Sequence, residues 1–345
     1  MSTQLSFSVS EDHDAETNKT VQYGTFSRNW AEEVELDALI DSLEAGRISH
    51  EQGLLRARKL LVKFPGQLEI QNFIANRLWS LEMRDESTDL REKAYRQAIA
   101  LLPPAFKGQI SWAEIDNRSF LRIAHGFLLG LMHQGDSKAA KVLATKLLAW
   151  CPADNLGVRM LIGDISLMTG DSKTAMKSYL TEAATSPAHW YQAGQIAFRD
   201  GDFVSACTYM RRGIAANPYI AEGLTGRTLI KEHLYWHASN RYGPDWATDY
   251  LSAPVCDWSA QEIDFPTASS MLTVLTPNSK CSSISGACRS MEVLTASLSS
   301  NLARYPWAIF GLHSKTPTLG WRLLTGSAPY LLVARGGFEP PTFGL

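Results

Sequence analysis

A block led by glycine recurs three times in the middle of this chain, and it restricts the possible fold more than any other feature. In each block an alanine follows the glycine after five residues and a proline follows it after seventeen. The three blocks are Gly135/Ala140/Pro152, Gly170/Ala175/Pro187 and Gly201/Ala206/Pro218. The glycines stand 35 and 31 residues apart, which is the period of a repeat made of two helices and a turn. The spacing therefore predicts consecutive pairs of antiparallel helices.

Each position of the block has a physical reason. A glycine ends a helix well because it adopts the left-handed backbone conformation without the steric cost that a Cβ brings. The aspartates that follow the three glycines, Asp136, Asp171 and Asp202, are residues that cap the start of the next helix. We expect the alanine to lie where two helices cross closely, and the proline to end the second helix of the pair.

These positions resemble the tetratricopeptide repeat, a pair of antiparallel helices of about 34 residues. The last unit has Trp190, Gly194, Ala206 and Pro218 at the large-aromatic, small, alanine and proline positions of that repeat. Two degenerate units can be read upstream, over residues 34–65 and 68–103. The resemblance implies an all-α, right-handed solenoid of about five helix pairs over residues 31–218, with an insertion at 104–120, and a helical cap over residues 219–265.

Three runs carry a narrower resemblance. They are Asp-Asn-Arg-Ser-Phe-Leu-Arg at 116–122, Cys-Pro-Ala-Asp-Asn-Leu-Gly-Val-Arg at 151–159 and Asn-Pro-Tyr-Ile at 217–220. They resemble bacterial tetratricopeptide proteins related to the suppressor-of-tumorigenicity-seven-like family, in which the first two runs typically read Asp-Asn-Arg-Pro-Phe-Leu-Arg and Asn-Pro-Asn-Asp-Asn-Gln-Gly-Val-Arg. The chain departs from that pattern at Ser119, Ala153 and Leu156. The resemblance implies a helical repeat fold and attaches no catalytic residues.

Charge and composition exclude several classes of protein. The first 265 residues carry a net charge of −6, which gives no basic face for nucleic acid. No run reaches the roughly 20 apolar residues that a membrane span needs. The five cysteines have no paired spacing, and the start has no secretory signal, so we expect a cytoplasmic protein. Residues 1–30 are polar and are expected to be a disordered lead-in.

Polar residues gather in the insertion and before one repeat helix. Two interpretations of them stay open: helix capping and packing across the helix hairpin, or a ligand site. The residues are Trp112, Asp116, Asn117, Arg118, Asp154 and Asn155. Trp112 and Trp190 are expected to be core residues, because tetratricopeptide units bury an aromatic side chain there.

Catalytic and metal-binding motifs are scarce. His233 and His237 have the i, i+4 spacing of a zinc site, but no glutamate follows His233, and only Cys256 or Asp249 could serve as a third ligand. The chain has neither a nucleophile elbow nor a phosphate-binding or dinucleotide-binding glycine loop. We therefore expect no catalytic activity and no cofactor.

The last eighty residues, 266–345, break the helical period. Twenty of them are Ser or Thr and none is Asp. The run Gly-Phe-Glu-Pro at 337–340 translates back to the T-arm sequence common to transfer RNA genes. Our hypothesis is that the reading frame was interrupted near Phe265 and continued through non-coding DNA. The alternative is a genuine but disordered extension.

Stacked helix pairs form a concave groove, lined by the first helix of each pair, that holds a peptide or a helix of a partner protein. Arginine and tyrosine there suit an acidic partner segment. By register, the groove-facing candidates are Arg122 and His125 in one unit, Arg159 and Asp164 in the next, and Tyr191, Gln195 and Arg199 in the last. The predicted function is that of an interaction scaffold. The alternative is an accessory part of a protein whose catalytic or metal-binding C-terminal domain is missing.

Overall fold

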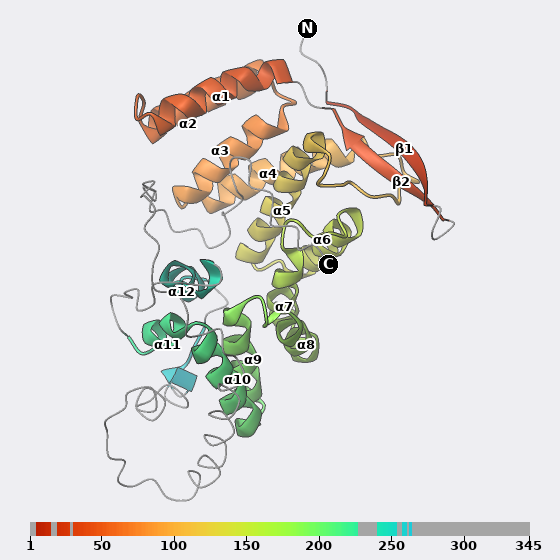
Figure 1. The fold of residues 1–345 in the computed structure, drawn as a ribbon. Coiled ribbons are helices and arrows are strands. Elements are labelled where there is room, and N and C mark those ends of the chain that lie inside the picture. Colours follow the sequence, from red (N-terminus) through yellow and green to blue (C-terminus); the bar gives the residue numbers. More distant parts are fainter. Residues whose placement is uncertain are drawn as a thin grey trace, which may run out of the picture. The chain divides into compact units, whose positions relative to one another are not determined.

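The structure is a computed structural model, and it describes residues 5–14, 19–27, 30–226, 240–253, 257–260, 262 and 263. Within these residues the regular secondary structure is helical apart from one two-stranded sheet (Figure 1). The hypothesis on residues 266–345 and the histidine pair at 233 and 237 lie outside the described residues.

Ten of the described helices form five consecutive pairs. The pairs are α1 (Trp30–Glu44) with α2 (His50–Lys63), α3 (Leu68–Ser80) with α4 (Arg84–Ile99), α5 (Arg118–His133) with α6 (Ser137–Trp150), α7 (Val158–Met168) with α8 (Ser172–Glu182), and α9 (Pro187–Arg199) with α10 (Phe203–Ala216). Each helix packs against the next one along the chain (Figure 1). The predicted all-α, tetratricopeptide-like architecture is confirmed.

In the part of the chain that the structure describes, two short helices follow the last pair. They are α11 (Pro218–Leu224) and α12 (Pro244–Leu251), which pack against each other, and a 3-10 turn, η2 (Asn240–Tyr242), precedes α12. The buried Asn217 side chain joins them: its Oδ1 accepts from the Tyr219 backbone N–H at 3.1 Å, and its Nδ2 donates to the Arg241 carbonyl oxygen at 3.0 Å.

The glycines and aspartates act as the sequence predicts. Gly135, Gly170 and Gly201 have φ angles of 78°, 77° and 78°, in the left-handed region that favours glycine. The aspartate after each glycine caps the following helix, accepting a hydrogen bond from the backbone N–H three residues later. Pro152 and Pro218 directly follow the C-caps of α6 and α10, where the second helix of the pair was expected to end. Pro187 and Pro218 are also the first residues of α9 and α11, where a missing N–H costs nothing, so they begin helices as well.

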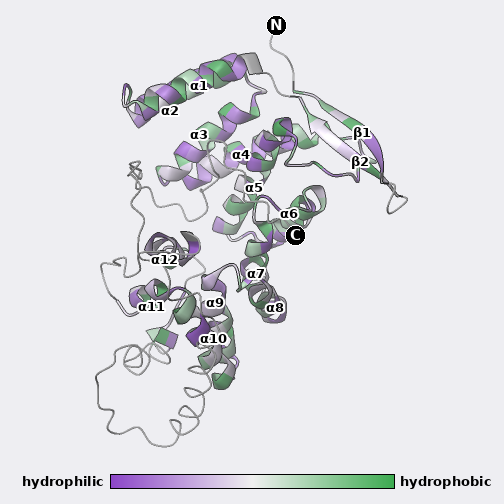
Figure 2. Ribbon diagram, viewed as in Figure 1, coloured by the Kyte–Doolittle hydropathy of each residue, from purple (hydrophilic) through white to green (hydrophobic). Residues whose placement is uncertain are grey.

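Small residues mark the helix crossings. Ala140, Ala175 and Ala206 have no exposed surface. A Cβ at Gly163 would lie 2.2 Å from Cε1 of Tyr179, so no larger residue fits there without movement. Figure 2 shows hydrophobic and hydrophilic residues on the same helices, as expected of helices that bury one face.

Replacing Ala206 by leucine is expected to lower the free energy of unfolding by about 1–3 kcal/mol, because extra methylenes in a filled crossing force side chains and backbone apart. The matched control is Val204→Leu in the same helix, where the side chain is 80% exposed. Urea denaturation measures both variants. Equal midpoints for the two would contradict the close crossing of α9 and α10.

The expectation that residues 1–30 form a disordered lead-in is corrected by a two-stranded hairpin in this region. Strands β1 (Phe7–Asp14) and β2 (Lys19–Phe26) form an antiparallel hairpin in which Phe7 is paired with Phe26. The Phe26 ring is buried, with its centroid 4.8 Å from that of Phe7 and 4.5 Å from that of Phe120 in α5. Burial of these rings gives the hairpin a core that its polar composition does not suggest.

The insertion at 104–120 binds this hairpin through backbone hydrogen bonds. The Gly24 N–H donates to the Gln109 carbonyl oxygen at 2.8 Å, and the Gln109 N–H donates to the Gln22 carbonyl oxygen at 2.7 Å. A Cβ at Gly108 would lie 2.2 Å from the Gln22 carbonyl oxygen, so a glycine is needed where the two backbones meet. The insertion ends in a 3-10 turn, η1 (Ile115–Asn117), that leads into α5.

Candidate functional site

The seven predicted groove residues lie on three first helices, α5, α7 and α9, as expected. Their surroundings differ. His125, Asp164, Tyr191 and Gln195 are buried, whereas Arg122, Arg159 and Arg199 reach solvent in part. The expectation that all seven face an open groove is therefore corrected for the buried four. A first helix is covered by its own partner helix and by the neighbouring pairs, which leaves little of its surface free.

On α5, Arg122 forms an ion pair with Glu69 of α3 at 3.0 Å, and its guanidinium lies 5.6 Å from the centroid of the Trp112 ring. The Ser119 hydroxyl donates to the other oxygen of the same Glu69 carboxylate at 2.8 Å. One turn further along α5, burial and the nearby Arg91 charge lower the pKa of His125 to about 4. His125 is therefore a neutral packing residue near pH 7.

The polar residues before α5 join the hairpin to the repeats. Asn117 is fully buried: its Oδ1 accepts from the Phe26 N–H at 3.0 Å, and its Nδ2 donates to the carbonyl oxygens of Gly24 and Ser111. It makes no side-chain capping bond to α5. Arg118 donates to the Trp112 carbonyl oxygen at 3.0 Å, and its guanidinium lies over the Trp112 ring. Of the two interpretations, these contacts favour packing.

Before α7, Asp154 is a helix cap. Its two carboxylate oxygens accept from the backbone N–H groups of Val158 and Arg159, at 2.7 and 2.9 Å. The Arg159 side chain turns back to donate to the Pro152 carbonyl oxygen and lies 3.7 Å from the Asp154 carboxylate. Asn155 is exposed, and Asp116 half-buried.

Asp164 lies in a buried polar cluster between α7, α8 and α9. Its Oδ1 accepts from the Tyr179 hydroxyl at 2.7 Å and from Gln192 Nε2 at 3.1 Å. Burial raises the pKa of Asp164 to about 6, although both hydrogen bonds act to lower it. Asp164 was predicted to face a partner protein, but it accepts hydrogen bonds from buried side chains of its own chain.

The Asp164→Asn variant tests this burial. Because the native carboxyl keeps its proton to a higher pH than the unfolded one, its contribution to the free energy of unfolding falls as pH rises from about 4 to about 6. Asparagine does not ionise, so the variant is expected to gain about 3 kcal/mol relative to the wild type between pH 4 and pH 7. Urea denaturation at a series of pH values measures the difference.

Comparison with the wild type at each pH is needed because His125 and His189, whose pKa values burial lowers to about 4, titrate in the opposite direction. Asp37→Asn, on the exposed face of α1, is the matched control for the substitution itself. A difference between Asp164→Asn and the wild type that does not change with pH would mean that this carboxyl ionises normally in the folded protein.

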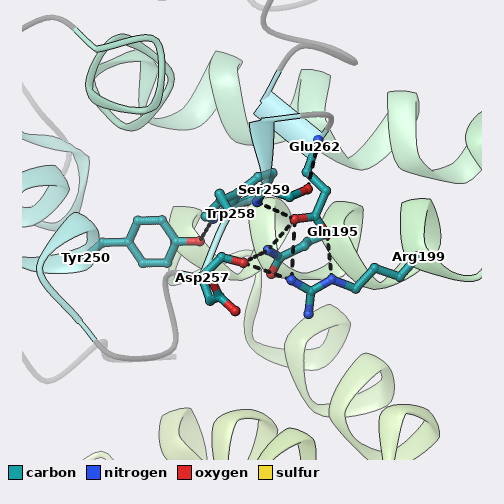
Figure 3. A network of polar contacts seen from close by, with 7 residues as sticks. All are labelled: Gln195, Arg199, Tyr250, Asp257, Trp258, Ser259 and Glu262. Carbon is teal, nitrogen blue, oxygen red and sulfur yellow. Dashed lines mark hydrogen bonds and ion pairs between the residues drawn. The ribbon is translucent and has the colours of Figure 1, made fainter.

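The helix α9 carries the most developed polar site. Tyr191 is fully buried, its hydroxyl donates to the Asn217 carbonyl oxygen at 2.8 Å, and burial raises its pKa well above the usual value. Gln195 and Arg199 lie one turn apart on the same side of α9. Both form hydrogen bonds with a segment near the end of the described chain (Figure 3). We call this segment, residues 257–260, 262 and 263, the docked segment.

Two groups of the docked segment receive these donors. The Asp257 carbonyl oxygen accepts from Gln195 Nε2 at 2.7 Å and from Arg199 Nη2 at 2.8 Å. The Glu262 carboxylate accepts from Arg199 Nε at 2.5 Å and from Gln195 Nε2 at 3.4 Å. The predicted pair thus binds an acidic residue, but one of the same chain, 63 residues beyond Arg199.

The docked segment also holds itself together. The Ser259 N–H donates to Glu262 Oε2 at 2.8 Å, and the Glu262 N–H donates to the Ser259 hydroxyl at 3.3 Å (Figure 3). This reciprocal pair is a capping box, the arrangement that starts a helix. The Trp258 indole N–H donates to the Tyr250 hydroxyl of α12 at 3.1 Å.

The electrostatics of the pair favour a charged Glu262. Burial would raise the pKa of this carboxyl, since only 4% of the side chain is exposed, but the hydrogen bonds from Arg199 and Ser259 outweigh burial and lower its pKa. Arg199 keeps 44% of its side chain exposed. The site is therefore a partly open ion pair at the protein surface.

No three side chains of His, Cys, Asp or Glu are grouped so as to hold a metal ion in the part of the chain that the structure describes. None of the helices described is both long and apolar enough to cross a membrane.

No family model matches this chain, and no curated protein matches it. Among solved structures it is similar to a MamA RS-1 ArsTM double mutant, at 11% identity and a TM-score of 0.43, over 55% of this chain and 96% of that one. Two crystal structures of MamA match at 10% and 9% identity, with TM-scores of 0.39 and 0.42, over 51% and 58% of this chain and 91% and 98% of theirs. TM-scores below 0.5 do not identify a common fold, so the repeat architecture rests on the helix pairs themselves.

Proposed function

We propose that this chain is a protein-interaction scaffold that binds acidic segments of a partner protein on the first helices of its repeats and has no catalytic activity of its own. We assign it to a reducing cytoplasm, because its five cysteines have no paired spacing. We also propose that this chain is related to the bacterial tetratricopeptide proteins named above.

The observation that carries the proposal is the way α9 binds the docked segment. A side-chain amide and a guanidinium, one helical turn apart, together hold a backbone carbonyl and a carboxylate. These are the groups that an acidic peptide of any protein offers. Arg122 on α5 and Arg159 on α7 are further arginines on first helices that reach solvent in part, and each lies, like Arg199, beside an acid of this chain.

Selection of random peptides displayed on phage against the full chain tests the proposal. Acidic peptides are expected to be enriched, and their affinity should weaken with salt because partly exposed ion pairs are screened. The affinity should fall about tenfold or more on the Arg199→Glu variant, since the new carboxylate repels the acid. The control is Lys177→Glu, the same charge change at an exposed position on α8.

Two results would contradict the scaffold proposal. One is a selection that enriches nothing over a panning on denatured protein. The other is a set of enriched peptides without acidic residues, which bind equally well to the wild type and to variants in which Arg122, Arg159 and Arg199 are each changed to glutamate.

A further inference from the structure

We infer that the Gln195–Arg199 face of α9 recognises one kind of partner segment, a peptide that begins a helix with an aromatic residue, a serine and, three residues after the serine, a glutamate. The docked segment, with Trp258, Ser259 and Glu262, is the resident occupant that such a partner displaces. This inference rests on the proposed function and names its partner class.

The donors on α9 contact two groups of a bound segment, a backbone carbonyl and a carboxylate. The Asp257 carbonyl oxygen, which receives both donors, is a group that every peptide has, so this contact sets the register of a bound segment and not its sequence. The second contact is selective, because only a carboxylate five residues later completes the ion pair with Arg199. A peptide must therefore bring an acid at a fixed distance from the carbonyl.

The docked segment itself orients the acid that binds Arg199. Glu262 is held in place by its own segment, since the capping box with Ser259 positions the carboxylate before it meets Arg199. A peptide that forms this box on its own loses less conformational freedom on binding than an extended acidic peptide does. Serine or threonine at the cap and glutamate three residues later are the residue types of a capping box, which makes the preference a sequence pattern.

The aromatic residue of the docked segment has an apolar contact of its own. Trp258 packs against the apolar cluster formed by α9, α10, α11 and α12, which includes Tyr191, Tyr219 and Tyr250. Its indole N–H also has a fixed partner, the Tyr250 hydroxyl, at 3.1 Å. The packing of Trp258 adds an apolar anchor beside the ion pair, and an anchor of this type carries much of the affinity in short-peptide recognition.

The docked segment can exchange with a peptide from solution. The ion pair between Glu262 and Arg199 is open to water on the arginine side, where 44% of the side chain is exposed, so a competing carboxylate can reach the guanidinium. The occupant nevertheless competes well, because three residues, 254–256, join it to Ala253 and keep its effective concentration high. A peptide added in solution is therefore expected to bind the wild type weakly and to bind tightly once the resident carboxylate is removed.

The experiment uses the full chain and a fluorescent peptide with the sequence of residues 257–265, Asp-Trp-Ser-Ala-Gln-Glu-Ile-Asp-Phe, followed by fluorescence anisotropy. The Glu262→Ala chain is expected to bind this peptide at least tenfold more tightly than the wild type does. Adding Arg199→Ala to that variant should remove the gain. A peptide with glutamine in place of its glutamate should bind at least tenfold more weakly. The matched chain control is Glu51→Ala at an exposed site on α2.

Circular dichroism checks that each variant is folded, and Glu262→Gln, which keeps the shape of the side chain, replaces Glu262→Ala if the alanine variant is not. The inference is overturned if folded Glu262 variants bind the peptide no better than the wild type. It is also overturned if the wild type forms dimers that Glu262→Ala abolishes, since the segment would then be exchanged between copies. Acidic peptides selected on the wild type would in either case leave the scaffold proposal standing, which separates the two failures.

Discussion

The Phe26→Ala variant is expected to lose about 3–5 kcal/mol of its free energy of unfolding, the range found when a buried phenylalanine is truncated in a core. The Phe26 side chain is 1% exposed and is the point where the hairpin enters the core of the repeats, against Phe120. Urea denaturation gives the free energy. Hydrogen exchange gives its location, which should be the amides of residues 19–26 and the insertion.

Phe203→Ala is the matched control, because the same side chain in α10 is 52% exposed and its removal should change stability little. If Phe26→Ala behaved like this control, the hairpin would contribute nothing to the fold, and the original expectation of a disordered lead-in would hold in solution.

The second large effect is expected for Asn117→Ala. This side chain makes three hydrogen bonds in a fully buried place, and its removal leaves the Phe26 N–H and the carbonyl oxygens of Gly24 and Ser111 without it. A buried polar group that loses its partner costs about 1–3 kcal/mol, and three groups lose theirs, so the total loss should be at least about 3 kcal/mol. Thermal and urea unfolding measure it, and the amides of β2 should exchange faster.

The control for this substitution is Asn155→Ala. Asn155 has the same side chain and precedes a helix in the same way, but it is exposed, and its only described side-chain contact is one with the Cys151 sulfur at 3.8 Å. A similar loss in both variants would mean that Asn117 acts through local turn preference and not through its contacts with the hairpin.

The repeat architecture could be predicted because its signals are local. A left-handed glycine, a capping aspartate and an alanine at a crossing each act within one helix pair, so their spacing reports the fold directly. Gly170, Asp171 and Ala175 all lie where the pattern predicts. The hairpin could not be predicted in this way, because Phe26 becomes a core residue only through contacts with the insertion some 90 residues later.

The candidate site was predicted in part. Gln195 and Arg199 share a face of α9 by their spacing of four residues, and they do bind an acid. The occupant Glu262 was missed, although its capping-box signal, Ser259 followed by Glu262, stands in the sequence. His125, Asp164 and Tyr191 were expected to face a groove, but burial depends on how many neighbours cover a helix, and helical register does not report that number.

The contact between the hairpin and the insertion has a consequence for synthesis. In a plain repeat array each pair can fold as soon as its neighbour exists. Here the Phe26 N–H can form its hydrogen bond only after Asn117, 91 residues further along the chain, has been synthesised. At ordinary elongation rates this delay is roughly 5–20 s. During that time α1 to α4 form beside a hairpin whose aromatic side has nothing to pack on. The strands of the hairpin thus reach their final state only after α1 to α4, and in this interval a chaperone or a strand of another protein has access to them.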